Sequence, residues 1–254
     1  HQHVLPSLVF VERHCLSTGE SASGTGAVIA QQGDPKEGPL PLIVTANHVI
    51  KTTPNLEYEF RLTKYDWSSP SRPASRSAVF RTGGVGPRSP GVKCYGGPLP
   101  DMFDIGFIRG PFSCDDGRPF FQLDKAGALL EGQLIPIEGG FTWSSEGTPV
   151  GWTGYAALAS EIAQRPTPCY FQGHVAALIL RDEFQLYLLD GHNTFGVSGG
   201  PVWATANNQA RLIGVISSYR SVLGTPELPG FVSVIPIQPL RQYLERDWNA
   251  KSGS

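Results

Sequence analysis

Short apolar runs of strand length recur along the chain, and clusters of glycine, proline and asparagine separate them. Such clusters lie at residues 33–35, 96–98, 139–140 and 206–208. The clearest predicted strands are Leu8–Val11, Gly26–Ala30, Leu42–Thr45, Ile105–Arg109, Gln133–Ile137, Val175–Leu180, Gln185–Leu189, Leu212–Ser217 and Phe231–Ile235. Many short strands joined by turns are typical of antiparallel barrels and sandwiches. The pattern therefore predicts an all-β protein.

Helical periodicity is confined to two segments. Apolar residues after Pro239 recur at helical spacing, which predicts a C-terminal helix. A second short helix is expected within residues 155–165. Because Pro, Gly and Asp are enriched over residues 110–132, we place a boundary there. The prediction is an N-terminal β half over residues 1–120, and a C-terminal β half with the helix over residues 121–254.

Composition and charge narrow the class of protein. The chain has 254 residues, of which 40% are hydrophobic and 17% charged, and this excludes a disordered chain. Its 30 Gly and 22 Pro argue against a helical bundle. The net charge of −2 gives no reason to expect a nucleic-acid partner. Residues 61–93 hold seven Lys and Arg and one acid; we interpret them as a solvated loop or long hairpin, with a contact surface for an anionic partner as the alternative.

Cysteine spacing and hydropathy bear on metal binding and membrane insertion. Cys15, Cys94, Cys114 and Cys169 show no C-x-x-C spacing, so no metal site and no cofactor are predicted. Their even number permits two disulfides without requiring them. No apolar run reaches 18 residues, so no membrane span is expected. The chain begins with His1 rather than Met, from which we expect a processed or trimmed chain.

Three short segments carry residue types that together can activate a serine. His48 stands at the end of an apolar strand, Asp104 precedes another, and Ser198 lies in a glycine-rich turn. A serine hydroxyl is a weak nucleophile, so it needs a histidine base, which in turn needs a carboxylate to orient it. The backbone N–H groups of Gly196 and Ser198 are expected to form an oxyanion hole.

Each residue alone has a plainer explanation, as a packed histidine, a turn aspartate or a tight turn, but their order along the chain is informative. The turn also fits the Gly-x-Ser-x-Gly motif of α/β-hydrolases, which requires a histidine after the serine. All six histidines precede Ser198. The subtilisin order would need Asp34, which lies in a Gly-Asp-Pro turn. The order His, Asp, Ser therefore remains.

This order resembles that of the chymotrypsin-like serine proteases, and most closely the trypsin-like peptidase domains of the Deg/HtrA type. The resemblance covers about residues 8–247. It rests on the segments Gly24–Ile29, Thr45–Val49, Asp104–Gly106, Gly196–Pro201 and Leu212–Ser217. It implies two six-stranded antiparallel β-barrels with the active site in the cleft between them. His48 and Asp104 would come from the first barrel and Ser198 from the second.

Departures from the family pattern concern disulfides and activation. Val49 follows the histidine where secreted trypsins carry a cysteine, and no cysteine lies near Ser198. The missing disulfide positions favour an intracellular location. Val197 stands where trypsins carry an aspartate that pairs with a newly cut N-terminus. A valine cannot form that ion pair, so we expect this chain not to be activated by that route.

The resemblance also suggests a primary specificity pocket. His192 would lie at its base, and Tyr219 and Gly230 would correspond to its walls. Since none of the three is acidic, a preference for Lys or Arg is not expected. A tyrosine wall narrows the pocket and favours small or medium apolar residues. Recognition of an acidic residue by His192, or no role for this histidine, are the alternatives.

The sequence thus predicts a serine endopeptidase that acts on polypeptides through an acyl-enzyme, without a cofactor and without membrane association. The alternative is a catalytically latent or inactive trypsin-like fold that acts as a regulated binding module. A regulatory partner, or a longer parent chain, fits both.

Overall fold

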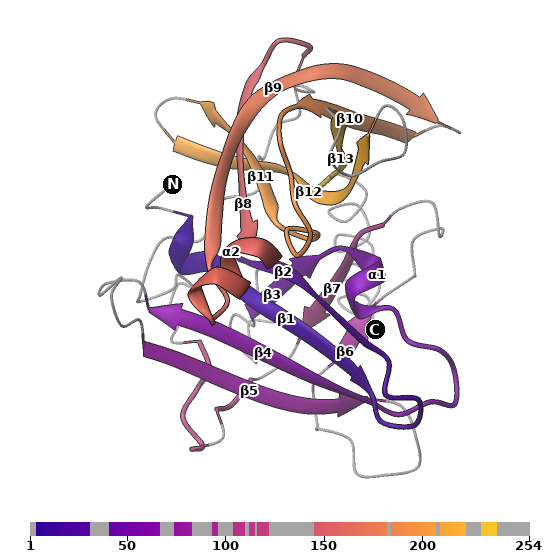
Figure 1. The fold of residues 1–254 in the computed structure, drawn as a ribbon, viewed down its shortest axis with the longest axis vertical. Helices are drawn as coiled ribbons and strands as arrows, with labels where there is room; N and C mark the ends of the chain where they lie inside the picture. Colours follow the sequence, from indigo (N-terminus) through magenta and orange to yellow (C-terminus); the bar gives the residue numbers. More distant parts are fainter. Residues whose placement is uncertain are drawn as a thin grey trace, which may run out of the picture.

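The computed structural model consists of two β-units that meet along one side (Figure 1). The strands of the N-terminal unit all lie before residue 110, and those of the C-terminal unit all lie after residue 148. The structure describes residues 4–30, 41–66, 74–82, 93–95, 104–109, 112–114, 116–121, 145–181, 184–206, 209–221 and 230–237.

The N-terminal unit is a single curved antiparallel sheet. Its elements are the 3-10 helix η1 (Leu5–Ser7), β1 (Leu8–Cys15), β2 (Ser21–Ala30), β3 (Pro41–Thr45), α1 (Asn47–Ile50), β4 (Tyr58–Asp66), β5 (Ala74–Thr82), β6 (Lys93–Tyr95) and β7 (Gly106–Arg109). The strand order is β5-β4-β1-β2-β3-β7-β6. Phe80 of β5 and Ile108 of β7 lie far apart in this order but share one buried core, so the sheet curls around that core.

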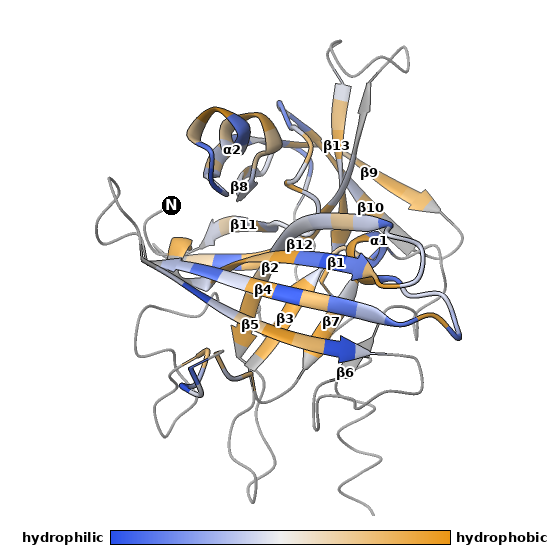
Figure 2. Cartoon of the chain, turned by 60° about the horizontal axis from the view of Figure 1, so that its bottom comes forward, coloured by the Kyte–Doolittle hydropathy of each residue, from blue (hydrophilic) through white to orange (hydrophobic). Residues whose placement is uncertain are grey.

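Alternation of side chains explains which face of the sheet is buried. Along β4, Tyr58, Phe60 and Leu62 are buried, whereas Glu59 and Arg61 between them point away from the core. Figure 2 shows this change of hydropathy along the strand. Successive strand residues face opposite sides, so an apolar residue at every second position builds one continuous core.

The first part of the basic stretch forms the β4–β5 hairpin, which confirms the long hairpin expected there. Lys64 is buried, and its ammonium group lies 5.5 Å from the centre of the Phe121 ring. Arg81 forms an ion pair of 3.0 Å with Glu59. These two cations therefore make contacts within the N-terminal unit.

The C-terminal unit is a closed antiparallel barrel. Its elements are β8 (Pro149–Tyr155), α2 (Ala157–Ala163), β9 (Pro168–Arg181), β10 (Phe184–Asp190), β11 (Pro201–Ala206), β12 (Gln209–Ser221) and β13 (Gly230–Pro236). The order around the barrel is β10-β13-β12-β11-β8-β9. Its core centres on the fully buried Trp152, whose ring stacks on Phe171 at 6.0 Å between centroids.

A third apolar cluster joins the two units. Val44 and Phe107 of the sheet pack with Tyr155, Leu212 and Ile235 of the barrel in one buried group. Because both units bury side chains there, their relative position is fixed by packing as well as by the connecting chain.

The predicted all-β, chymotrypsin-like fold is confirmed. The C-terminal half closes into a six-stranded barrel as expected, and α2 is the short helix expected within residues 155–165. The N-terminal half contains a seventh strand, because the short β6 pairs with the outer edge of β7. The predicted strand Gln133–Ile137 and the C-terminal helix fall outside the described residues. The boundary at residues 120/121 stays a prediction.

Free thiols and short helices characterise the described chain. Cys15 and Cys169 are free, so neither of these two takes part in a disulfide. Within the described ranges, no helix is long and apolar enough to cross a membrane.

Candidate active site

His48 is carried by α1, a helix of four residues that follows directly on β3. Its neighbours Asn47, Val49 and Ile50 are buried and anchor the helix against the sheet. The His48 side chain points the other way and is 51% exposed. The apolar run around the histidine thus fixes the backbone and leaves the imidazole accessible.

Asp104, just before β7, holds His48 by two hydrogen bonds, one from its backbone and one from its imidazole. Its Oδ1 accepts the backbone N–H of His48 at 2.8 Å, and its Oδ2 lies 2.7 Å from His48 Nδ1. An ionised carboxylate can only accept, so Nδ1 carries the proton of this contact. In the neutral ring, Nε2 is then left as the acceptor, which is the state a general base needs.

Ser217 binds the same carboxylate from the other unit. Its hydroxyl donates to Asp104 Oδ2 at 2.7 Å. The β12–β13 register shifts between Ile216 and Ser218, so Ser217 is the extra residue of a β-bulge. A bulge redirects a side chain out of the regular alternation, and here it directs a barrel hydroxyl to an aspartate of the N-terminal unit.

The environment of Asp104 favours its ionised form. Burial on its own raises the pKa of this carboxyl, but hydrogen bonds from His48 and Ser217, together with the charge of His48, outweigh burial and hold the pKa below its ordinary value. A carboxylate that stays ionised can both orient an imidazole and stabilise the imidazolium that forms during proton transfer.

Two glycines with positive φ shape the turn that carries Ser198. Gly196 has φ +88° and Gly199 has φ +82°, a region that side-chain-bearing residues rarely adopt. A Cβ on Gly199 would collide with the carbonyl oxygen of Thr25 and the hydroxyl of Thr45. The turn thus needs glycine at residue 199 for its conformation and for its close approach to the sheet.

Backbone hydrogen bonds fasten the turn to both units. Thr25 of β2 donates its N–H to Ser198 O at 2.7 Å and its hydroxyl to Gly196 O at 3.0 Å. On the barrel side, Gly199 N–H donates to Ile216 O at 2.7 Å. The serine backbone is therefore held between β2 and β12.

Gly24 lets the serine turn and α1 approach the same point. A Cβ at this position would lie 2.6 Å from Val49 Cγ2 and 2.8 Å from Ser198 O. Val49 is the residue after His48, so the absence of a side chain at Gly24 is what brings the histidine helix and the serine turn together across the sheet.

The functional groups of the turn are unengaged. Among the described residues, the N–H groups of Gly196 and Ser198 donate no hydrogen bond, and no hydrogen bond joins Ser198 Oγ to His48 Nε2. Two free N–H donors beside a free hydroxyl are what an oxyanion site requires. Nucleophile–base hydrogen bonds are often long before substrate binds, and they tighten in the complex.

The predicted pocket residues all belong to the C-terminal unit. His192 is exposed between β10 and the serine turn. Tyr219 of β12 pairs with Val232, and Gly230 pairs with Ser221. The Tyr219 side chain is outside the described residues, so the specificity pocket stays a prediction. Val197, in contrast, is fully buried in the barrel core.

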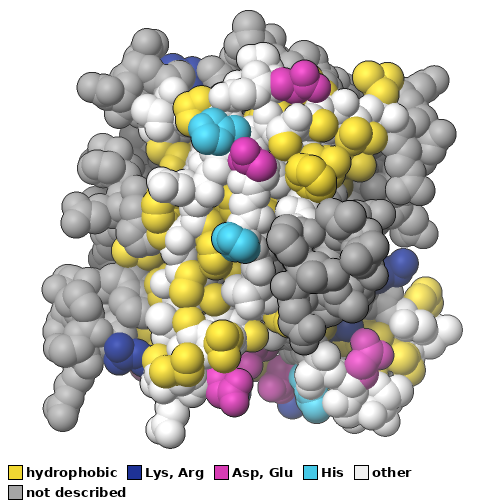
Figure 3. Space-filling model, turned by 45° about the horizontal axis from the view of Figure 1, so that its top comes forward, with side chains coloured by type: hydrophobic (Ala, Val, Ile, Leu, Met, Phe, Trp, Pro, Cys, Tyr) yellow, Lys and Arg dark blue, Asp and Glu magenta, His cyan; other side chains and the backbone are white. Residues whose placement is uncertain are grey.

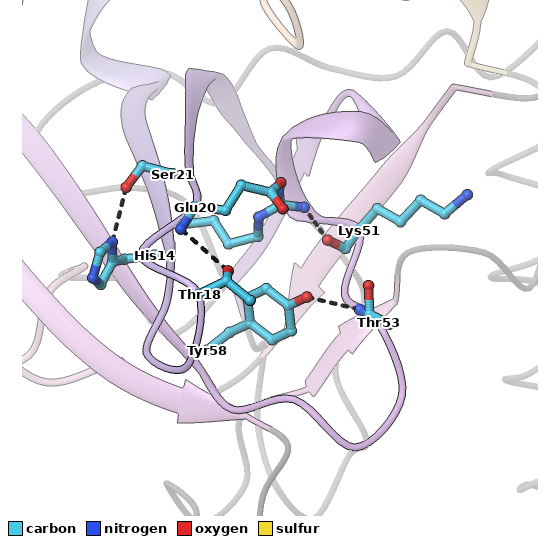
Figure 4. A network of polar contacts seen from close by, with 8 residues as sticks. His14, Thr18, Glu20, Ser21, Lys51, Thr53 and Tyr58 are labelled. Atoms are coloured by element: carbon cyan, nitrogen blue, oxygen red, sulfur yellow. Dashed lines mark hydrogen bonds and ion pairs between the residues drawn. The ribbon is translucent and has the colours of Figure 1, made fainter.

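A polar network behind α1 was not anticipated from the sequence (Figure 4). Arg13 of β1 is buried, donates to the carbonyl oxygen of Lys51, and pairs with Glu20 at 2.9 Å. Lys51 is the C-cap of the histidine helix. The Arg13 guanidinium also lies 5.5 Å from the centre of the Tyr58 ring, and Tyr58 OH accepts the N–H of Thr53 at 3.0 Å. The network ties the end of α1 to the sheet.

Sequence reasoning also missed the roles of Thr25 and Ser217, although both lie in segments that carried the family resemblance. The Gly-Thr-Gly pattern around Thr25 was the available signal, because two glycines beside a threonine allow close backbone approach. No group of three or more His, Cys, Asp or Glu side chains that could hold a metal ion occurs in the part of the chain that is described.

Comparisons with known proteins bear on the fold. No protein-family model and no curated protein matches this chain. A thermostable serine protease, AL20, from an extremophilic microorganism is 14% identical, with a TM-score of 0.54 over 91% of each chain. The active form of the Rv3671c protease from M. tuberculosis is 15% identical, with a TM-score of 0.54 over 96% of this chain and 82% of that one. At these identities the similarity establishes architecture: this chain has the chymotrypsin-like fold of serine proteases.

Proposed function

We propose that this chain is a serine endopeptidase, with Ser198 as nucleophile, His48 as general base and acid, and Asp104 as the carboxylate that orients the imidazole. The observation that carries the proposal is the double hydrogen bond between His48 and Asp104, fixed further by Ser217. The similarity in fold to two serine proteases supports it.

The reaction follows from the roles of these groups. His48 Nε2 takes the proton of Ser198 Oγ as the oxygen attacks the peptide carbonyl carbon. The N–H groups of Gly196 and Ser198 stabilise the oxyanion, each contributing about 3 kcal/mol of barrier lowering. His48 then protonates the leaving amine, which leaves an acyl-enzyme on Ser198. Water, deprotonated by His48, then attacks the ester carbonyl carbon. The bond to Ser198 Oγ breaks, His48 returns the proton to Oγ, and the carboxylic acid product leaves.

The substrate is a polypeptide, and its preferred residue at the cleaved position is small or medium-sized and apolar. This rests on the expected pocket of His192, Tyr219 and Gly230, which contains no acid to pair with Lys or Arg. A cleavage profile dominated by Arg in a peptide library would refute this part of the proposal and leave the nucleophile unaffected.

The deciding experiment is labelling with a fluorophosphonate probe, read by intact mass. The wild type should gain one adduct, and Ser198→Ala should gain none. Ser145→Ala, which changes an exposed serine before β8, is the matched control and should label like the wild type. A folded wild type without an adduct would contradict the proposal and favour the latent or inactive fold that binds partners.

A further inference from the structure

Helix α2 presents its large apolar side chains to solvent. Leu158 is 63% exposed and Ile162 is 78% exposed. Residues four apart lie on the same face of a helix, so these two side chains are neighbours. The inward side of the helix offers only small residues, such as Ala159, which packs against the barrel core. A surface helix normally buries its apolar face, so the orientation of α2 is the reverse of the usual one.

This exposed face adjoins the serine turn. Ala157, the first residue of α2, donates its N–H to Phe195 O at 2.7 Å. Gly196 packs so closely on Tyr155 O that no Cβ fits between them. Phe195 is itself 75% exposed. We call Leu158, Ile162 and Phe195 the rim surface.

On the face of the molecule drawn in Figure 3, hydrophobic side chains gather in groups near histidine side chains. Large exposed apolar groups that lie together commonly mark a binding surface. Its position next to Gly196, rather than its exposure alone, indicates the occupant. A peptide carbonyl held by the N–H of Gly196 brings the neighbouring substrate residues past α2.

We infer that the rim surface binds apolar side chains of the polypeptide substrate within a few residues of the scissile bond. This inference rests on the proposed function. The charge of α2 favours apolar over acidic substrate side chains. The ionisable residue of this helix is Glu161, which is exposed and negatively charged. An acidic substrate residue there would be repelled, whereas an apolar one gains by leaving water.

The test separates nucleophile reactivity from substrate binding. The double variant Leu158→Gln/Ile162→Gln removes the apolar surface and keeps a residue of good helix propensity. Leu180→Gln is the matched control, because Leu180 is 79% exposed. Strand β9 begins just after α2, and Leu180 lies near its far end, about 40 Å along the strand from Pro168 (Figure 1). Each protein is assayed for its fluorophosphonate labelling rate, and for kcat/KM on paired internally quenched peptides that differ by Leu or Ser at one position beside the scissile bond.

The expected result is an unchanged labelling rate for the double variant, with kcat/KM about tenfold lower on the Leu peptides and unchanged on their Ser partners. Leu180→Gln should match the wild type on every substrate. Equal kcat/KM values for the double variant and the wild type on the Leu peptides would overturn the inference. So would an equal loss on both peptide sets.

Two further outcomes also decide the question. If the double variant abolishes self-association in sedimentation and leaves peptide kinetics unchanged, the rim surface binds a second copy of this chain and the inference is wrong. If the wild type itself does not label, the proposed function fails, and the inference falls with it for that separate reason.

Discussion

The histidine side and the serine side of the candidate site are held in different ways. On the histidine side, Asp104 accepts two hydrogen bonds from His48 and one from Ser217, so a charged side chain fixes another side chain. On the serine side, backbone hydrogen bonds to Thr25 and Ile216 fix the turn, and no other described residue forms a hydrogen bond with the Ser198 hydroxyl. The imidazole ring of His48 is thus held in a fixed orientation by its hydrogen bonds. For Ser198, only the backbone is held in this way.

This difference indicates where each half is vulnerable. The histidine side depends on groups that change with protonation and with side-chain substitution. The serine side depends on space and on backbone conformation, so it is sensitive to added atoms.

Removing the charge of Asp104 should cause the largest loss. Asp104→Asn keeps the size of the side chain but no longer holds Nδ1 as the donor, so kcat should fall about 10⁴-fold. Acylation kinetics with a peptide ester measure it. Asp116→Asn is the control, because Asp116 is exposed and pairs with Arg118 rather than with His48. A loss below tenfold for Asp104→Asn would contradict the assigned role.

Adding one carbon to Gly199 should damage the serine side through space and strain together. Gly199→Ala places a Cβ against Thr25 and Thr45, so we expect about 3 kcal/mol lower stability and about hundredfold slower labelling. Gly147→Ala is the control: Gly147 has φ +80° but nothing within 4 Å of a Cβ, so it should cost about 1 kcal/mol. Urea unfolding compares the two. Equal losses would show that close packing of the turn is unimportant.

Loss of the Ser217 hydroxyl should change how the stability of the protein depends on pH. Its hydrogen bond helps to lower the pKa of Asp104, so Ser217→Ala should raise that pKa and reduce kcat about tenfold. The stability contributed by ionised Asp104 is present above about pH 3.9, the pKa of an unfolded Asp, and is lost as the pH falls through the lower folded pKa.

The acid limb of stability in Ser217→Ala should therefore begin at the same pH as in the wild type, because the unfolded pKa sets its onset. It should end at a higher pH and span a smaller loss, as measured by urea unfolding across about pH 2 to 6. Ser233→Ala, which changes a buried serine on the neighbouring β13, should leave the limb in place. A parallel shift in both variants would mean that the effect comes from packing.

The smallest effect on rate should come from the network behind α1. Arg13→Met removes the donor to Lys51 O, so the end of the histidine helix loosens, and kcat should fall about threefold. KM should stay unchanged, because the substrate does not contact Arg13. Arg81→Met is the control, because it also removes an arginine that forms an ion pair with a glutamate, Glu59, but this arginine is exposed. A change confined to KM would show that Arg13 does not act through α1.

The sequence predicted the chemistry better than the geometry. The order of His48, Asp104 and Ser198 indicated a serine hydrolase because residue types alone define which groups can donate, accept or attack. The β12 bulge at Ser217 was not predictable, because a register shift depends on the partner strand β13 as much as on the local sequence. The contact of Gly24 with both Val49 and Ser198 joins segments distant in the chain, which hydrophobic periodicity does not reveal.

Periodicity also limited the description of the fold. Short apolar runs predicted the barrel strands β9, β10, β12 and β13, but β8 and β11 were not predicted as strands. The seventh strand of the N-terminal sheet, β6, was not predicted. It has only three residues, too few for a recognisable pattern, and is a strand because it pairs with β7.

By itself, then, the sequence determined the class of fold, the candidate nucleophile, base and carboxylate, and the glycines needed near Ser198. These follow from local chemistry: hydropathy, side-chain type and backbone freedom. Tertiary structure alone decided that Ser217 of the barrel reaches Asp104 of the sheet, that Thr25 fastens the serine turn, and that α2 turns its apolar side outward beside that turn. The first two are contacts between distant segments that depend on how the two units pack against each other, and the third depends on how α2 packs against the barrel.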